Sequence, residues 1–288
     1  MIIRINNQAL DFTLDKEKTL GDVFTGIEQW LSSSGHRLSE ISVDGQVINA
    51  SMIEDIFSRD INTVKFLDIN TNVIAELTAA SLLNLLEDIS EYESLDFENK
   101  TKFLDTWKGR PQAQFMYAEM PDLYSFFINT FSNNDISPAV LRSITEEIQR
   151  EVNDPVNEIT KIEPVLNEIC IKLTDLPLDI QTGKDLLAAQ TLQLFSAITE
   201  KIIRIFYQLN SQCYLTDKNE IKKIAQDFSD FKNVLKELLE AYEKNDTVIV
   251  GDLAEYEAAP RLKEIYTSIL KNSMDPLSSK NFELKDAK

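Results

Sequence analysis

The chain has 288 residues, of which 43% are hydrophobic and 9% aromatic, and this apolar content excludes a globally disordered protein. The formal net charge is −19: residues 1–72 carry 6 basic and 11 acidic side chains, and the remaining residues carry 23 and 37. A field of that sign repels phosphate backbones and anionic lipid head groups, so we expect binding neither to nucleic acid nor to a membrane surface.

The sequence also bears on the compartment. No uncharged apolar run reaches the length of about 18 residues that is typical of a transmembrane helix. The first residues, MIIRINNQALDFTLD, are typical of a β-strand and lack the pattern of a signal peptide. The two cysteines, Cys170 and Cys213, lie far apart within helical patterns, which does not support a disulfide framework. Together these features predict a cytoplasmic protein.

Alternation of apolar and polar residues marks the start of the chain. Two alternating runs flank Asn6-Asn7 and predict a β-hairpin. The apolar residues of these runs are Ile3, Ile5, Leu10, Phe12 and Leu14. A second hairpin is predicted around Ile41–Val47, where Asp44-Gly45 suits a type I′ turn. A short helical turn around Met52–Phe57 and a last strand at Thr63–Ile69 complete the predicted elements of this kind.

A helix is predicted between the two hairpins. Thr19 is placed to cap its N-terminus, with Asp22 three residues later. Apolar residues then recur at helical spacing, at Leu20, Phe24, Ile27 and Leu31, and Gly35 is a plausible terminator. The resulting order, β-β-α-β-β, resembles a ubiquitin-like β-grasp domain. Modifiers of that type end in a free Gly-Gly tail, whereas here Asn70–Asn72 lead directly into a helix, so covalent conjugation through this domain is not expected.

After residue 72 the apolar residues follow the helical period. Helices are predicted at about 73–89, 97–107, 156–174, 183–209, 217–243 and 248–271, with two more that begin at Pro121 and at Ser137-Pro138. Breaks are predicted at Gly109–Pro111, at Asp154-Pro155 and at Leu176–Asp179, with a kink at Pro260. The two longest segments are expected to form an antiparallel pair. We therefore predict an α+β chain with a β-grasp-like domain at 1–72, a helical bundle at 73–272 and a flexible tail at 273–288.

The sequence has few catalytic signals. It contains one histidine, His36, which by itself offers neither a metal cluster nor a Cys–His pair. Neither Cys170 nor Cys213 has a partner in a CxxC motif, and the sequence supplies neither with a neighbouring base or positive charge that would activate a thiolate. Phosphate-binding glycine loops are absent, so no cofactor is expected. The aromatic residues of Phe115–Phe131 are expected to belong to a core.

One acidic segment stands out as a candidate site. Residues 246–257 contain Asp246, Asp252, Glu255 and Glu257. On an α-helix, Asp252 and Glu255 would share a face and could hold a hard cation. The same carboxylates could instead face a partner protein, or simply favour the start of a helix. The spacing of this segment is similar to a pattern in uncharacterised bacterial proteins, a resemblance that implies no function.

Two functional hypotheses follow. The first is a non-enzymatic cytoplasmic adaptor or scaffold that binds another protein, with the acidic surface meeting a basic one. The second is a carboxylate-based, metal-dependent enzyme centred on Asp252 and Glu255. The lack of catalytic motifs favours the first.

Overall fold

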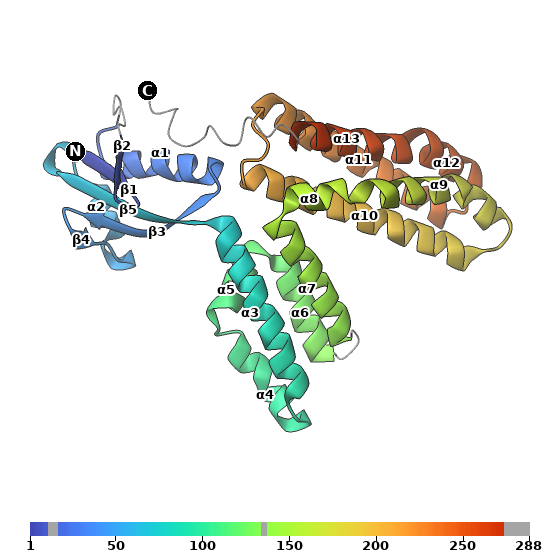
Figure 1. Cartoon of the computed structure of the whole chain (residues 1–288), viewed down its shortest axis with the longest axis horizontal. Helices are drawn as coiled ribbons and strands as arrows, with labels where there is room; N and C mark the ends of the chain where they lie inside the picture. The colour runs from blue at the N-terminus through green and yellow to red at the C-terminus, as the bar shows by residue number, and fades with distance from the viewer. Residues whose placement is uncertain (11–16, 134–136, 274–288) are drawn as a thin grey trace. The chain divides into compact units, whose positions relative to one another are not determined.

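The computed structural model describes residues 1–10, 17–133 and 137–273, and the α+β fold is confirmed (Figure 1). Contacts divide the chain into two compact units, which we call the N-terminal unit (Met1–Asn153) and the C-terminal unit (from Asp154). The N-terminal unit contains a mixed β-sheet followed by helices, and the C-terminal unit is helical. Within the described residues no helix is both long and apolar enough to cross a membrane.

The sheet of the N-terminal unit has five strands in the order β2-β1-β5-β3-β4. The strands are β1 (Ile2–Ile5), β2 (Gln8–Leu10), β3 (His36–Val43), β4 (Gln46–Val47) and β5 (Phe66–Val73). The central pair, β1 and β5, is parallel, whereas β1–β2, β3–β4 and β3–β5 are antiparallel. The first and last strands of this region, β1 and β5, therefore lie side by side. The chain between them forms β2 at one edge of the sheet, the helix α1, and then β3 and β4 at the other edge.

The type I′ turn predicted at Asp44-Gly45 is confirmed, and the predicted turn at Asn6-Asn7 has the same conformation. Asn6 and Asn7 have φ values of 49° and 65°, and Asp44 and Gly45 have values of 50° and 85°. Two consecutive residues with positive φ are the signature of a type I′ turn, which Asn, Asp and Gly tolerate best. The predicted strand residues Phe12 and Leu14 lie outside the described residues.

Helix α1 (Leu20–Ser33) covers one face of the sheet (Figure 1). The Thr19 side chain accepts a hydrogen bond from the Asp22 backbone N–H, and the Asp22 carboxylate accepts one from the Thr19 N–H, so the predicted capping box is confirmed. The first core then forms between the apolar face of α1 and the inward side chains of β1, β3 and β5: Ile3, Leu20, Phe24, Ile27, Leu31, Val43, Leu67 and Ile69.

Three strand boundaries differ from the prediction, and one of them is the end of β5, which lies at Val73 rather than Ile69. β3 begins at His36 rather than Ile41, because pairing with β5 satisfies the backbone of a polar stretch that has no apolar alternation. β5 begins at Phe66 rather than Thr63, because Ile61–Thr63 form a 3-10 turn (η2) capped by the Asp60 side chain. The predicted helical turn is present as a 3-10 turn, η1 (Ala50–Met52), followed by α2 (Ile53–Phe57).

The rest of the N-terminal unit is helical, with its own core. Its helices are α3 (Ile74–Ser94), α4 (Phe97–Trp107), α5 (Pro111–Glu119), α6 (Pro121–Asn133) and α7 (Pro138–Asn153). Trp107 stacks on Phe127 with 3.9 Å between ring centroids, and both side chains are fully buried. Of the aromatic stretch Phe115–Phe131, Phe127 and Phe131 belong to the core as expected, whereas Tyr117 is 69% exposed. Helix α5 was not predicted, since the sequence analysis treated Gly109–Pro111 only as a break. In the structure this break is a short corner, and Pro111 occupies the first turn of a new helix.

The C-terminal unit contains α8 (Pro155–Thr160), α9 (Ile162–Gln181), α10 (Asp185–Ser211), α11 (Lys218–Glu243), α12 (Thr247–Asp252), a π-helical turn η3 (Leu253–Ala258) and α13 (Ala259–Ser273). Its core runs from Ile159 to Ile269 and is separate from those of the N-terminal unit. The ring of Phe206 lies 5.5 Å from that of Phe228, and the ring of Phe195 lies 6.3 Å from that of Phe231. These two ring contacts connect α10 to α11, but the closest packing partner of α10 is α9, and α11 packs against α12, η3 and α13, so the predicted pairing of the two longest helices is not the main one in this unit.

The connector predicted at Leu176–Asp179 is wrong. Helix α9 continues through Pro177 to Gln181, with Leu176 and Ile180 buried in the core. Burial of these two side chains outweighs the helix-breaking tendency of proline. Pro177 also packs against Gly251 of α12, where a Cβ atom would lie only 3.1 Å from the proline Cγ. Near Pro260, where a kink was predicted, the π-helical turn η3 ends at Ala258, two residues before the proline.

Candidate functional site

The acidic segment 246–257 comprises the N-cap of α12, the whole of α12 and most of the turn η3. Two of its four predicted site residues have local structural partners. Asp246 caps α12, with its Oδ1 accepting a hydrogen bond from the Ile249 N–H at 3.2 Å. Glu257 pairs with Arg261, one turn later, with 2.6 Å between Oε2 and Nε. Both carboxylates therefore stabilise the local helices.

The other two predicted residues, Asp252 and Glu255, are exposed on either side of the α12–η3 junction. The π-helical turn changes the spacing on which the shared-face argument depends, because its hydrogen bonds join residues i and i+5. Within 1–10, 17–133 and 137–273, no three His, Cys, Asp or Glu side chains are grouped so that they could hold a metal ion. The two carboxylates thus have no third ligand among the described residues.

The pKa of Tyr256 reflects the negative charge of this surface. Its side chain is 66% exposed, and the negative charge of Glu255 raises the pKa of its hydroxyl, with a hydrogen bond to Glu255 and the charge of Asp252 acting in the same direction. Glu255 and Asp252 therefore both place negative charge near an exposed tyrosine. This is an acidic, partly aromatic surface rather than a closed reaction site.

Exposed apolar side chains lie in the same segment. Val248 is 69% and Ile249 48% exposed, whereas Val250 between this pair and η3 is fully buried. The N-terminus of α12 is tied to the C-terminus of α9 by a hydrogen bond from Gln181 Nε2 to Thr247 Oγ1 at 3.3 Å.

The helix ends around α12 carry further exposed apolar side chains. Leu178, near the end of α9, is 57% exposed, and Leu186, at the start of α10, is 74% exposed. Figure 1 shows the α9–α10 turn and α12 at the same end of the C-terminal unit. We call Leu178, Leu186, Val248 and Ile249 the bundle-end patch. Apolar side chains of this kind, in an acidic setting, are typical of a protein-binding surface.

An open groove of about 730 Å³ lies beside Tyr256, between α11 and α13. Its walls carry charges of both signs, including Lys223 and Lys263 as well as Asp227 and Asp230. Mixed charges on an open groove favour no particular small ligand, since neither a phosphate nor a cation finds a surface of one sign.

The histidine and the two thiols have structural surroundings. His36 begins β3, and its Nδ1 lies 2.8 Å from the Ser34 carbonyl oxygen, so the ring contributes to the end of α1. Burial raises the pKa of the Cys170 thiol and also that of the Cys213 thiol. A raised pKa lowers the thiolate fraction at neutral pH, which is the opposite of what a catalytic cysteine requires.

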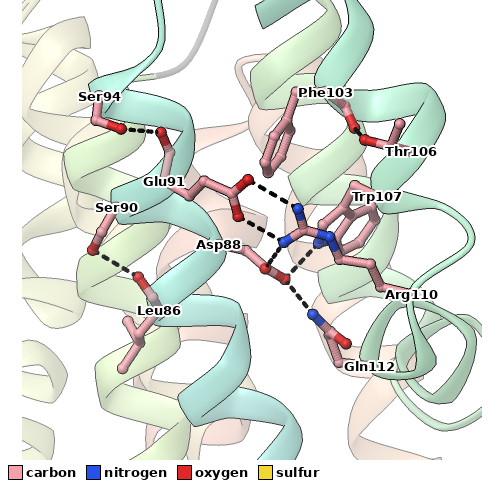
Figure 2. Close-up of polar contacts among 10 residues, drawn as sticks. All are labelled: Leu86, Asp88, Ser90, Glu91, Ser94, Phe103, Thr106, Trp107, Arg110 and Gln112. Atoms are coloured by element: carbon pink, nitrogen blue, oxygen red, sulfur yellow. Dashed lines mark hydrogen bonds and ion pairs between the residues drawn. The ribbon is translucent and has the colours of Figure 1, made fainter.

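The most tightly connected polar cluster was not predicted; it lies in the N-terminal unit (Figure 2). Asp88 of α3 is only 3% exposed. Its carboxylate accepts hydrogen bonds from Trp107 Nε1 at 2.6 Å, from Gln112 Nε2 at 2.9 Å and from the Arg110 guanidinium. Arg110 also binds Glu91 through two nitrogen atoms, at 2.8 and 3.0 Å. We call these five residues the Asp88 network.

Within the Asp88 network, Arg110 and Glu91 each stabilise the charged form of the other. The hydrogen bond from Arg110 lowers the pKa of Glu91, and the hydrogen bond to Glu91 raises the pKa of Arg110. The guanidinium also lies 5.1 Å from the centre of the Phe103 ring. Because every oxygen of Asp88 already accepts a hydrogen bond, the carboxylate is not presented to a substrate. The network joins α3 to the α4–α5 corner.

One feature of the sequence could have indicated the Asp88 network. Asp88 falls on the buried side of α3, three residues after Leu85 and four before Tyr92, both of which are buried. A carboxylate on an apolar face requires buried donors. The sequence does not show which residues donate, because Trp107 comes from α4, Arg110 from the α4–α5 corner and Gln112 from α5.

Comparisons with known proteins agree with this organisation. Residues 1–72 match a family model described as the TP0873 N-terminal domain, and residues 157–268 match a domain of unknown function, DUF8042. An uncharacterised protein of Treponema pallidum (strain Nichols) is 23% identical over 276 residues, which cover 95% of this chain and 98% of the relative. No solved structure matches. The chain is thus similar to this bacterial protein over nearly its whole length, and the similarity includes both matched domains.

Proposed function

We propose that this chain is a non-enzymatic cytoplasmic adaptor or scaffold that holds a partner protein through the bundle-end patch. The observation that carries the proposal is the exposure of Val248 and Ile249 within an acidic segment, at the end of the C-terminal unit where the helices that carry exposed Leu178 and Leu186 also meet. Apolar side chains at this site supply anchors, and the surrounding carboxylates select a partner with a basic surface.

The sheet of the N-terminal unit supports the same proposal. We infer that it is a ubiquitin-like β-grasp, because its strand order is β2-β1-β5-β3-β4 with β1 and β5 parallel at the centre. The fold by itself specifies no reaction. A sheet with exposed edges is, however, well suited to binding another chain.

The proposal is tested by capturing partners from a lysate of the organism that makes the protein. Three immobilised full-length proteins are compared: the wild type, a Val248→Ser/Ile249→Ser variant, and a Tyr207→Ser control. Tyr207 is 62% exposed and lies near the other end of α10 from Leu186, roughly 30 Å away along the helix. We expect one stoichiometric partner with the wild type and the control and its loss with the double variant. Equal capture by all three proteins would contradict the assignment of the bundle-end patch.

The electrostatic part is tested with the captured partner. Raising the salt concentration from about 0.05 to about 0.5 M shortens the Debye length to below about 5 Å. Association should therefore slow severalfold, whereas dissociation, which is governed by the apolar anchors, should change less. An association rate that does not respond to salt would show that the acidic surface does not guide the encounter.

A further inference from the structure

Strand β3 has an edge that is only partly covered. β5 pairs with β3 along its whole length, from His36 to Val43. On the other side β4 pairs only with Ser42 and Val43, and one further hydrogen bond joins the Ile48 N–H to the Ile41 carbonyl. In the part of the chain that the structure describes, no strand pairs with the outer edge of residues 36–40. Such an edge presents backbone donors and acceptors to an incoming strand.

An apolar slot lies directly beside this edge. The cavity has a volume of about 310 Å³ and is bounded by α1 and by Leu38 and Ile41 of β3. Buried Ile27 and Leu31 of α1 form part of its walls. We call it the edge groove. Its volume accommodates an aliphatic side chain with part of the backbone that carries it.

A β-bulge explains why two residues of β3 reach the edge groove. Leu38 and Ile41 are three positions apart, so strict alternation would place their side chains on opposite faces of the sheet. The register shifts between Leu38 and Glu40, which adds one residue to β3 relative to β5. The bulge therefore turns both apolar side chains toward α1, next to the open edge.

The charge of the edge groove indicates what would bind there. Asp22 and Glu28 of α1 are exposed and line it, and no basic side chain does so among the described residues. Arg37, the nearest cation on β3, forms an ion pair with Glu119. An occupant would thus meet backbone hydrogen-bonding groups on one side, an apolar slot in the middle and carboxylates on the other side.

We propose that the edge of β3 and the edge groove bind an extended segment of a partner protein that adds a strand at His36–Glu40, inserts an aliphatic side chain beside Leu38 and Ile41, and directs Lys or Arg side chains toward Asp22 and Glu28. The proposal rests on the proposed function only in treating the chain as a protein-binding module. Its surface lies in the N-terminal unit, whereas the bundle-end patch lies in the C-terminal unit, so an adaptor would hold two partners.

The test uses the full-length chain and a labelled peptide, acetyl-Lys-Val-Ile-Val-Lys-Val-Lys-amide, with binding followed by fluorescence anisotropy. Three comparison peptides replace every Lys by Glu, every Val and Ile by Ser, or methylate alternate backbone nitrogens. We expect saturable binding of the first peptide and weakening by about tenfold or more on methylation, because two or three backbone hydrogen bonds are lost. The Glu and Ser peptides should bind more weakly than the first one.

Two variants and one control variant test whether the peptide binds in the edge groove. Thr25→Trp fills the edge groove from an exposed position on α1 and should abolish binding without disturbing the core. Glu28→Lys should weaken binding severalfold, whereas Glu87→Lys, which makes the same charge change at an exposed position on α3, should not. The amide signals of residues 36–41 should shift with the wild type and remain in place with Thr25→Trp.

Several outcomes would overturn the proposal. These are the absence of saturable binding, binding that survives both backbone methylation and Thr25→Trp, or a wild-type dimer that Thr25→Trp dissociates, which would assign the edge to a second copy of the chain. The Val248→Ser/Ile249→Ser variant should bind the peptide normally, and Thr25→Trp should still capture the partner of the bundle-end patch. Failure of the peptide with intact capture would therefore refute this inference alone, and the reverse result would refute only the proposed function of the bundle-end patch.

Discussion

Acidic residues stand in two contrasting settings in this protein. In the N-terminal unit, Asp88 is buried and Glu91 is held by Arg110, and the donors that satisfy them come from three separate positions in sequence. In the C-terminal unit, four carboxylates lie within twelve residues, yet Asp246 only caps a helix and Glu257 pairs with Arg261 on the next turn. The carboxylates of residues 246–257 are the more conspicuous in the sequence because they are close along the chain. The charges of the Asp88 network are the more strongly coupled because they are close in space.

The difference has a physical cause. Charges that are neighbours along an exposed helix interact mostly through water, where screening leaves each pair worth about 0–1 kcal/mol. A buried carboxylate loses that hydration, so its donors must replace the lost hydrogen bonds. The contrast predicts unequal effects of mutation in the two settings.

The largest effect is expected at Asp88. Asp88→Asn removes the charge that Arg110, Trp107 and Gln112 share and leaves buried donors without a suitable acceptor. We expect the free energy of unfolding of the N-terminal unit to fall by about 3 kcal/mol. Urea unfolding followed by tryptophan fluorescence measures this unit selectively, because both tryptophans, Trp30 and Trp107, belong to it. Glu87→Gln, at the adjacent exposed position, is the matched control and should change stability by less than about 0.5 kcal/mol. Equal effects of the two substitutions would remove the contrast.

The next largest effect is expected at Asp246. Asp246→Ala deletes the side chain that accepts the Ile249 N–H and should cost the C-terminal unit about 1 kcal/mol. Urea unfolding followed by far-ultraviolet circular dichroism measures this loss. Asp246→Ser, which retains a capping oxygen, should restore most of the stability. A Ser variant no more stable than the Ala variant would show that the cap is not the role of this residue.

The third prediction concerns pH. The hydrogen bond from Arg110 lowers the pKa of Glu91 from its ordinary value of 4.5. A carboxylate with a lower pKa in the folded state contributes stability above its unfolded-state pKa and loses that contribution as the pH falls through the folded-state value. The stability difference between the wild type and Glu91→Gln should therefore be constant above about pH 5 and shrink below it. Urea titrations between pH 3 and 7 measure the difference; one that grows toward low pH would contradict the sign.

The smallest effect is expected at Asp252. Asp252→Asn removes an exposed charge that has no third ligand among the described residues, so the stability should change by less than about 0.5 kcal/mol. A thermal-shift titration with Mg²⁺, Mn²⁺ or Ca²⁺ should give the same melting temperature with and without the cation, for both the wild type and the variant. Stabilisation of the wild type by one of these ions that is lost in Asp252→Asn would support the carboxylate-based enzyme instead.

Much of the local structure follows from the sequence. Type I′ turns at Asn6-Asn7 and Asp44-Gly45 are set by residues that tolerate positive φ. The capping box at Thr19 and the termini of the long helices α10 and α11 come from signals within a few residues of each other. These features could be predicted because the interactions that produce them are short-range.

Tertiary structure decided the remainder. Pro177 lies inside α9 because Leu176 and Ile180 are buried on either side of it, and Gly251 leaves room for the ring. Three further features depend on which helices and strands pack against each other: the Asp88 network, the open edge of β3 and the edge groove. Neither residue type nor hydrophobic periodicity predicts which elements pack together. The sequence by itself determined where most of the helices, turns and caps form, since backbone conformation responds to neighbouring residues. Only the packed structure determined which charges are coupled and which surfaces are left open, since burial and hydrogen-bond partners come from residues distant along the chain.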